Sequence, residues 1–269
     1  QPGAVIRFTL DGAEPSASRG QIYQQPIVVS NTAIVRAAAF LPNHLPSSVQ
    51  THTYLFPREV IQQPAAPPGV PAVWIGVDNQ SWTADYEMDP EVTADPQYAD
   101  SMFGALTALP ILSVVMKPED LFDNSTGIYP KSEARGSSWE RPASVEWIYP
   151  NGPTPYQVDC GIQCQGNSVR MPIKTPKHAF RLVFKGDYGA RKLEYAVFPD
   201  SPLRVFDTLV LRADFNYSWL HWDSTQRLRG QHGGRQAGTV RAHDDHVLAT
   251  LQASLVQAAG DGLDHFGQV

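Results

Sequence analysis

Basic side chains gather in one stretch of the sequence, CQGNSVRMPIKTPKHAFRLVFK. Gly166 would let the backbone approach an anion closely, and Arg170 and Lys177 would meet phosphate oxygens through charge-assisted hydrogen bonds. Ser168 and Arg181 lie in the same stretch and would add a hydroxyl group and a further cation. These residue types are suited to holding the phosphates of a nucleotide, provided that the fold brings them together.

Two predicted strands would position these groups. In VDCGIQC, residues 158–164, alternation places the apolar side chains on one face, and Asp159, Gly161 and Gln163 on the other. In KHAFRLVFK the apolar set is Phe180, Leu182 and Phe184. The cations expected on the opposite face are Lys177, Arg181 and Lys185.

A second interpretation is that these cations only face water, as most Lys and Arg side chains do. The sequence contains neither GxxxxGK[ST] nor GxGxxG, the glycine-rich motifs that would indicate a nucleotide loop. From the residue pattern alone, the solvent-facing interpretation is therefore favoured.

Composition limits the other classes of function. The chain has 269 residues and a net charge of −6, so we expect no nucleic-acid partner. No run approaches the ~20 apolar residues of a membrane span, so we expect none. Cys160 and Cys164 would lie about 13 Å apart along a strand, too far for a disulfide, and we expect both to be free and buried.

The chain divides into four predicted parts. Residues 1–56 hold short strand-like runs (VIRFTL, PIVVS, AIVRAAAF and THTYLF) between turns, which predicts a small, partial β-sandwich. Residues 57–73 are rich in proline and predict a stiff, extended linker. Residues 74–230 predict an α+β domain with a mainly antiparallel mixed sheet. Its predicted helix is 102–109, its predicted strands are 111–116, 143–148, 156–163, 179–184 and 208–212, and KPEDLF reads as a helix start.

The fourth part, residues 231–269, predicts an atypical tail that is helical or disordered. Val247, Leu248, Leu251 and Leu255 recur at helical spacing. His243 and His246 would share one face of this helix. No third metal ligand is implied, so an exposed helix start is favoured over a metal site.

The first part resembles the β-sandwich module appended to chitobiase and hexosaminidase-type enzymes. IRFTLDGAEPS and IVRAAAF carry this resemblance. The module usually has a further strand before Gly3, so we expect the sandwich to be incomplete here. In such proteins it is an accessory unit, and the resemblance implies no catalysis.

The third part resembles the CotH family of atypical protein kinases. WERPASVEWIYPNG, CGIQCQGNSVR, TPKHAFRLVFKGDYGARKLEY and FDTLVLRADFNYSW carry this resemblance, in family order. It implies an N-lobe-like fold in a secreted, multidomain bacterial protein. It also implies that ATP is held by Gly166, Ser168, Arg170, Lys177 and Arg181. Two positions depart from the family pattern, because His178 and Ala179 stand where it has Lys and Ser.

The resemblance also sets expectations for activity. A complete family member would transfer phosphate from ATP, with Mg²⁺, to hydroxyl groups of an unidentified protein acceptor. The acidic metal ligands of the family come from its C-terminal half, so we assign no catalytic residue or metal ligand here and expect this fragment to be inactive. Similarity stops near Gly230, and either a native tail or a reading-frame error would explain residues 231–269.

The alternative is a non-enzymatic protein at the cell surface or outside the cell, which uses the β-sandwich to attach to a polysaccharide or another protein. The six tryptophans invite a sugar platform, but they are scattered, and core packing is favoured. Asp214, Asn216 and Asp223 fit no calcium loop and are interpreted as turn residues.

Overall fold

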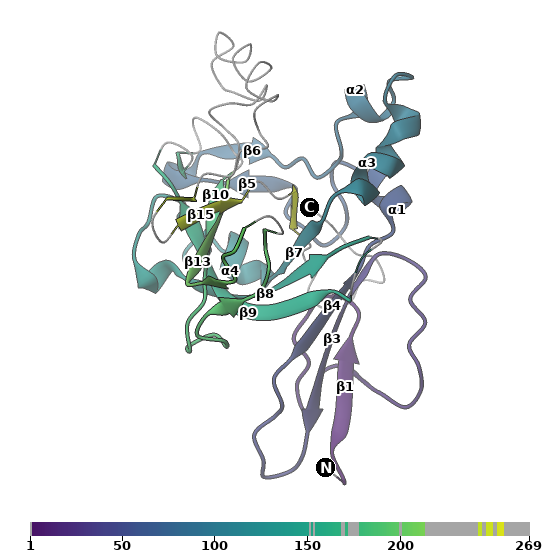
Figure 1. The fold of residues 1–269 in the computed structure, drawn as a ribbon, viewed down its shortest axis with the longest axis vertical. Coiled ribbons are helices and arrows are strands. Elements are labelled where there is room, and N and C mark those ends of the chain that lie inside the picture. Colours follow the sequence, from purple (N-terminus) through teal and green to yellow (C-terminus); the bar gives the residue numbers. More distant parts are fainter. Residues whose placement is uncertain are drawn as a thin grey trace.

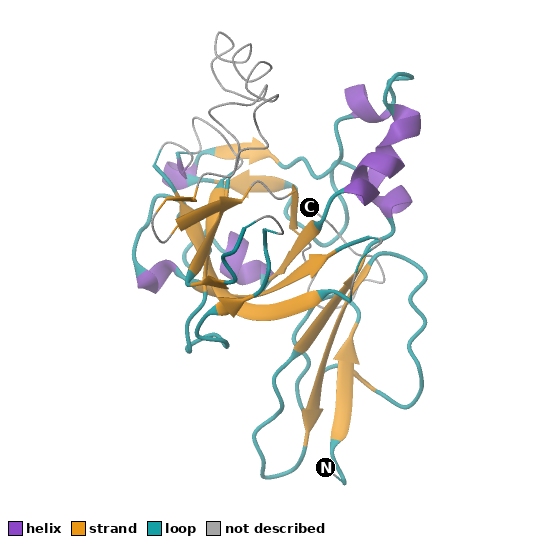
Figure 2. Ribbon diagram, viewed as in Figure 1, coloured by secondary structure: helices purple, strands orange, loops and turns teal. Residues whose placement is uncertain are grey.

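The computed structural model describes residues 2–150, 152, 154–167, 170–171, 178–198 and 201–212, and the strand backbones at 242–243, 246–249 and 252–255. This part of the protein is α+β, with mostly antiparallel sheets and few, short helices, as predicted (Figure 1; Figure 2). Figure 1 shows a narrow N-terminal sheet that extends away from a larger, curled sheet. Among the described residues, no helix has the length and apolar character needed to cross a bilayer.

The N-terminal sheet has the strand order β2-β1-β3-β4 and is antiparallel throughout. Its strands are β1 (Val5–Thr9), β2 (Gln21–Ile22), β3 (Ala33–Phe40) and β4 (Gln50–Tyr54). Three of the predicted runs are confirmed, but the strand predicted in PIVVS is wrong. Pro26 has no N–H to donate, Val28 is 87% exposed, and Ile27 and Val29 are only partly buried.

The proline-rich segment 57–73, predicted to be an extended linker, begins instead with the helix α1 (Pro57–Ile61). Proline suits the first helical turn, because its fixed φ matches the helix and its missing N–H would have no partner there. Glu59 Oε2 accepts a hydrogen bond from the Thr32 N–H at 2.7 Å. The segment is therefore attached to the N-terminal sheet from its first turn.

Short elements lead into the large sheet. They are β5 (Val73–Ile75), η1 (Val77–Asn79), β6 (Ser81–Thr83), α2 (Pro90–Thr93), η2 (Ala99–Ser101), α3 (Met102–Ala108), α4 (Pro118–Phe122) and η3 (Ser137–Trp139). The helices predicted at residue 102 and in KPEDLF are confirmed as α3 and α4.

The large sheet has the order β14-β15-β13-β10-β9-β8-β7-β16. Its central strands are β7 (Ile111–Val115), β8 (Arg141–Ile148), β9 (Tyr156–Gln165), β10 (Ala179–Val183) and β13 (Thr208–Leu211), all paired antiparallel. The five strands predicted for this domain are thus confirmed. A separate hairpin consists of β11 (Leu193–Glu194) and β12 (Val205–Phe206).

The prediction of a helical tail is wrong for the part of the tail that the structure describes. It forms β14 (Ala242–His243), β15 (His246–Ala249) and β16 (Gln252–Leu255). β15 pairs in parallel with β13, and β16 pairs in parallel with β7, so the tail lies at both edges of the large sheet. An open sheet edge offers unpaired backbone donors and acceptors, and this pairing overrides a short helical pattern. The register places His243 opposite His246 across a hairpin rather than on a helix turn.

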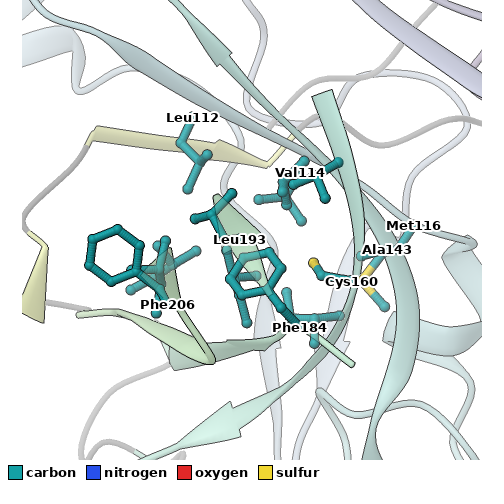
Figure 3. Close-up of a cluster of buried hydrophobic side chains, with 14 of the residues drawn as sticks. Leu112, Val114, Met116, Ala143, Cys160, Phe184, Leu193 and Phe206 are labelled. Carbon is teal, nitrogen blue, oxygen red and sulfur yellow. The ribbon is translucent and has the colours of Figure 1, made fainter. Parts of the chain in front are cut away.

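The core lies on the concave face of the large sheet. Figure 3 shows side chains of β7, β8 and β9 meeting Phe184, Leu193 and Phe206. The alternation predicted for β9 is confirmed, since Cys160 and Ile162 are fully buried. Cys160 and Cys164 are both free, and burial raises the pKa of the Cys164 thiol to about 12, which makes it unreactive at neutral pH.

Trp74 and Trp147 follow the core-packing interpretation. Trp147 is fully buried, and its ring lies 5.5 Å from that of Tyr195. Trp74 packs against the same core, and its indole N–H donates to the hydroxyl of Tyr86 at 2.9 Å. These two rings therefore stabilise the domain, and neither is free to stack on a sugar.

The outer face of the large sheet is partly shielded from solvent, because β4 packs against it. The Thr53 N–H donates to Glu146 Oε2 at 2.7 Å, and Thr53 Oγ1 lies 2.8 Å from Ser113 Oγ. Glu146 is 1% exposed, and its Oε1 has no hydrogen-bond partner among the described residues, with His52 Nδ1 3.7 Å away. Burial raises the pKa of Glu146 to about 7. The N-terminal sheet is thus held to β7 and β8 by buried polar contacts.

Candidate anion-binding site

A basic hollow of about 400 Å³ lies where β9 and β10 meet the turn that precedes η3. Its lining residues are Arg135, Gly136, Ser137, Gln163, Gln165, Gly166, Arg170 and Arg181. None of these described lining residues carries a carboxylate, so the formal charge of the lining comes from arginine alone. We call this feature the arginine hollow.

Gly166 directly follows β9 and lines the hollow. Its φ is 103°, in the left-handed region that residues with a side chain rarely adopt. The predicted glycine bend is therefore present at the end of β9.

Arg170 is buried, with 6% exposure. Its Nη1 donates to the Ala134 carbonyl at 2.6 Å and to the Ser132 carbonyl at 3.4 Å, and Ser132 Oγ donates back to the Arg170 carbonyl at 2.7 Å. Its Nε lacks a hydrogen-bond partner among the described residues. Burial lowers the pKa of this guanidinium, and the charges of Arg135 and Arg181 lower it further.

Arg181 lies on the outer face of β10, directly opposite Gln163 of β9. Its Nε is also buried and has no partner within the described part of the chain. Gly166, Arg170 and Arg181 thus line the same hollow. Ser168 and Lys177 lie outside the described residues.

Lys185 does not extend a free row of cations beyond Arg181. Its Nζ lies 2.6 Å from Glu140 Oε2 and 3.4 Å from Asp187 Oδ2, and it sits over the Tyr188 ring at 5.2 Å. Two carboxylates therefore neutralise this lysine, and the arginine hollow ends before it.

The two departures from the CotH-like pattern lie in the interior. His178 is 4% exposed, with its ring centroid 4.8 Å from that of Tyr129, and Ala179 is 5% exposed. Neither residue lines the hollow. A side chain at position 178 thus serves packing here rather than contact with an anion.

Arg135 is the lining cation that the sequence pattern did not indicate. Its Nη2 donates to Asn167 Oδ1 at 3.3 Å, and its charge lowers the pKa of Arg170. Arg135 and Asn167 are 32 positions apart in the sequence. The residue pattern of the loop after β9 contains nothing that indicates the turn before η3. Only the folded sheet brings this turn next to the loop after β9.

One comparison with known proteins gives a family match for the N-terminal sheet. Residues 1–54 match the family described as Fn3 associated. The match covers all four strands of that sheet and supports a β-sandwich-type module, coarser than the chitobiase-like resemblance. No curated protein and no solved structure matches the chain significantly.

The Fn3-associated module and the large sheet enclose a second cleft, of about 390 Å³. Its charged lining residues are Glu14, Arg36, Lys117, Asp120 and Asp159. Lys117 Nζ lies 3.5 Å from Glu14 Oε2, so part of this charge is already paired. Mixed charges give this cleft no preference for anions, which leaves the arginine hollow as the better candidate.

Metal ligation has no support in the described residues, where no cluster of three or more His, Cys, Asp or Glu side chains could hold an ion. Asp214, Asn216 and Asp223 lie outside those residues.

Proposed function

We propose that this chain is the N-terminal part of an exported CotH-like atypical protein kinase, and that the arginine hollow holds the phosphates of ATP. The observation that carries the proposal is the convergence of Arg135, Arg170 and Arg181 on one hollow beside Gly166, with no carboxylate in its described lining. A guanidinium group can donate two parallel hydrogen bonds to phosphate oxygens, and it stays charged at any physiological pH.

The lining residues fit the phosphates of a nucleotide and do not fit Mg²⁺. Mg²⁺ requires oxygen ligands in octahedral geometry, usually including carboxylates, whereas arginine side chains are donors only. Phosphoryl transfer also needs acidic residues for the ion and a group that orients the acceptor hydroxyl. In this proposal the intact protein supplies them from other residues, and its acceptor is a protein outside the cell or at the cell surface.

A second candidate function is a non-enzymatic extracellular scaffold. The observation that favours it is the use of Arg170 for hydrogen bonds to backbone carbonyls, since a purely structural arginine would make the same bonds. In that case the Fn3-associated module would carry the attachment to a polysaccharide or a protein.

Replacing Arg181 with glutamine tests the first proposal. We expect the Kd of the 269-residue chain for ATP, measured by isothermal titration calorimetry at low salt, to rise about tenfold, because one charge-assisted contact is lost. Arg191→Gln is the matched control, because Arg191 is exposed and lies outside the hollow, and its Kd should equal that of the wild type. Failure of the wild-type chain to bind ATP or inorganic tripolyphosphate would overturn the assignment of the hollow.

A further inference from the structure

The arginines of the hollow differ in how many of their donors are already used. Arg170 is 6% exposed, and its Nη1 donates to two carbonyls of the turn that precedes η3. The hydroxyl of Ser132 returns a third bond to the backbone of Arg170. These three bonds attach the loop after β9 to the turn. Nε of Arg170 has no partner among the described residues, but the 6% exposure of the side chain leaves this guanidinium little surface for a ligand.

Arg135 is exposed and lies directly after Ala134, the residue whose carbonyl Arg170 holds. Its described hydrogen bond, from Nη2 to Asn167 Oδ1, measures 3.3 Å. Charge-assisted bonds from a guanidinium to an anion measure about 2.7 to 2.9 Å. A phosphate oxygen would therefore form a shorter and stronger hydrogen bond with Arg135 than the neutral amide of Asn167 does.

Charge repulsion in the hollow favours an anion with several charges. Arg135 and Arg181 both disfavour the charge on Arg170, and the described lining offers no carboxylate to offset them. Arg135 comes from the turn before β8 and Arg181 from β10, so the two approach the hollow from different elements. A volume of about 400 Å³ leaves room for more than one phosphate group between them.

We infer that Arg135 and Arg181 contact the ligand, that Arg170 is a positioning residue which holds the turn carrying Arg135 in place, and that the hollow selects a polyphosphate over a single phosphate. This inference rests on the proposed function, since it assigns roles within the same site. It adds a contact residue that the sequence pattern did not indicate, and it removes Arg170 from direct contact.

The first experiment measures binding of inorganic tripolyphosphate and of orthophosphate to the 269-residue chain by isothermal titration calorimetry. Arg135→Gln should raise the Kd for tripolyphosphate about tenfold, leave the melting temperature unchanged, and have a smaller effect on orthophosphate. Arg135→Lys, which keeps the charge, should recover part of the loss. An unchanged Kd in Arg135→Gln would overturn the inference.

The second experiment is a double-mutant cycle between positions 135 and 170. Arg170→Lys should weaken tripolyphosphate binding in the wild-type background and have no further effect on the Kd in the Arg135→Gln background. Additive losses would mean that Arg170 itself contacts the anion, which contradicts the positioning role. If Arg170→Lys does not fold, the Arg135 variants alone still decide whether Arg135 is a contact residue.

The two levels of proposal fail in different ways. Absence of tripolyphosphate and ATP binding by the wild-type chain would remove the proposed function and this inference together. Wild-type binding that Arg181→Gln weakens and Arg135→Gln does not would remove the inference alone.

Discussion

Replacing Glu146 with glutamine is expected to raise the unfolding free energy by about 3 kcal/mol at pH 8 and by less than about 1 kcal/mol at pH 5. Glu146 is 1% exposed, and burial raises its pKa from 4.5 to about 7. The amide oxygen of glutamine would still accept the Thr53 N–H, which Glu146 Oε2 accepts in the native protein. The variant would therefore keep the hydrogen bond and lose only the charge.

The direction of this effect follows from proton linkage. The folded protein holds the Glu146 proton more tightly than the unfolded chain does, so its contribution to stability is fully present below pH 4.5. It is lost as the pH rises through about 7, where the buried carboxyl must ionise. Glutamine has no such transition, and the gap between the variant and the wild type should widen from pH 5 to pH 8.

Urea denaturation at several pH values between 5 and 8 measures this gap. Glu194→Gln is the matched control, because Glu194 is exposed on β11, and its pH profile should follow that of the wild type. Parallel pH profiles for the wild type and Glu146→Gln would show that another group controls the pH dependence.

Replacing Gly161 with alanine is expected to lower the unfolding free energy by about 1 to 3 kcal/mol. A Cβ atom at this position would lie 2.9 Å from Tyr188 Cδ2 and closer still to Cε2. The Tyr188 hydroxyl donates to Glu140 Oε2 at 3.2 Å, and the ring lies beneath the ammonium of Lys185. Moving the ring to make room for the new methyl group would disturb both contacts, and this disturbance accounts for the expected loss of stability.

The clash can be separated from other effects of the substitution by a second change. Tyr188→Ala removes the ring, so adding Gly161→Ala to that background should cost much less than it costs in the wild type. Gly104→Ala is the control, since an alanine Cβ at this position in α3 would meet no described atom within 4 Å, and helix propensity favours alanine there. Equal costs of Gly161→Ala with and without Tyr188 would contradict the proposed overlap.

The strands of the central sheet could be predicted because their alternation is strong. Cys160 and Ile162 alternate with Asp159 and Gly161, and the folded β9 buries the apolar set as expected. The glycine bend could also be predicted, since Gly166 needs a backbone conformation that few other residues adopt. Local sequence is sufficient where one strand or one turn determines the outcome.

Features that depend on distant partners were missed. Arg135 joins the hollow through a turn held by hydrogen bonds from Arg170, and neither residue signals the other in the sequence. The tail pattern at residues 247–255 suits a helix, but the edges of the sheet supply backbone partners that only the complete fold provides. The prediction of an extended linker for the proline-rich segment also took no account of the neighbouring sheet, against which the first helix of this segment lies.

The contact between Thr53 and Glu146 ties an early part of the chain to a strand made much later. The two residues are 93 positions apart, so the N-terminal module emerges from the ribosome well before its docking partner exists. During that interval β4 must keep its outward N–H groups hydrated, and the module lacks part of its final stability. Heat or force should consequently unfold the two units in one cooperative event, because buried polar contacts join the N-terminal sheet to the large sheet.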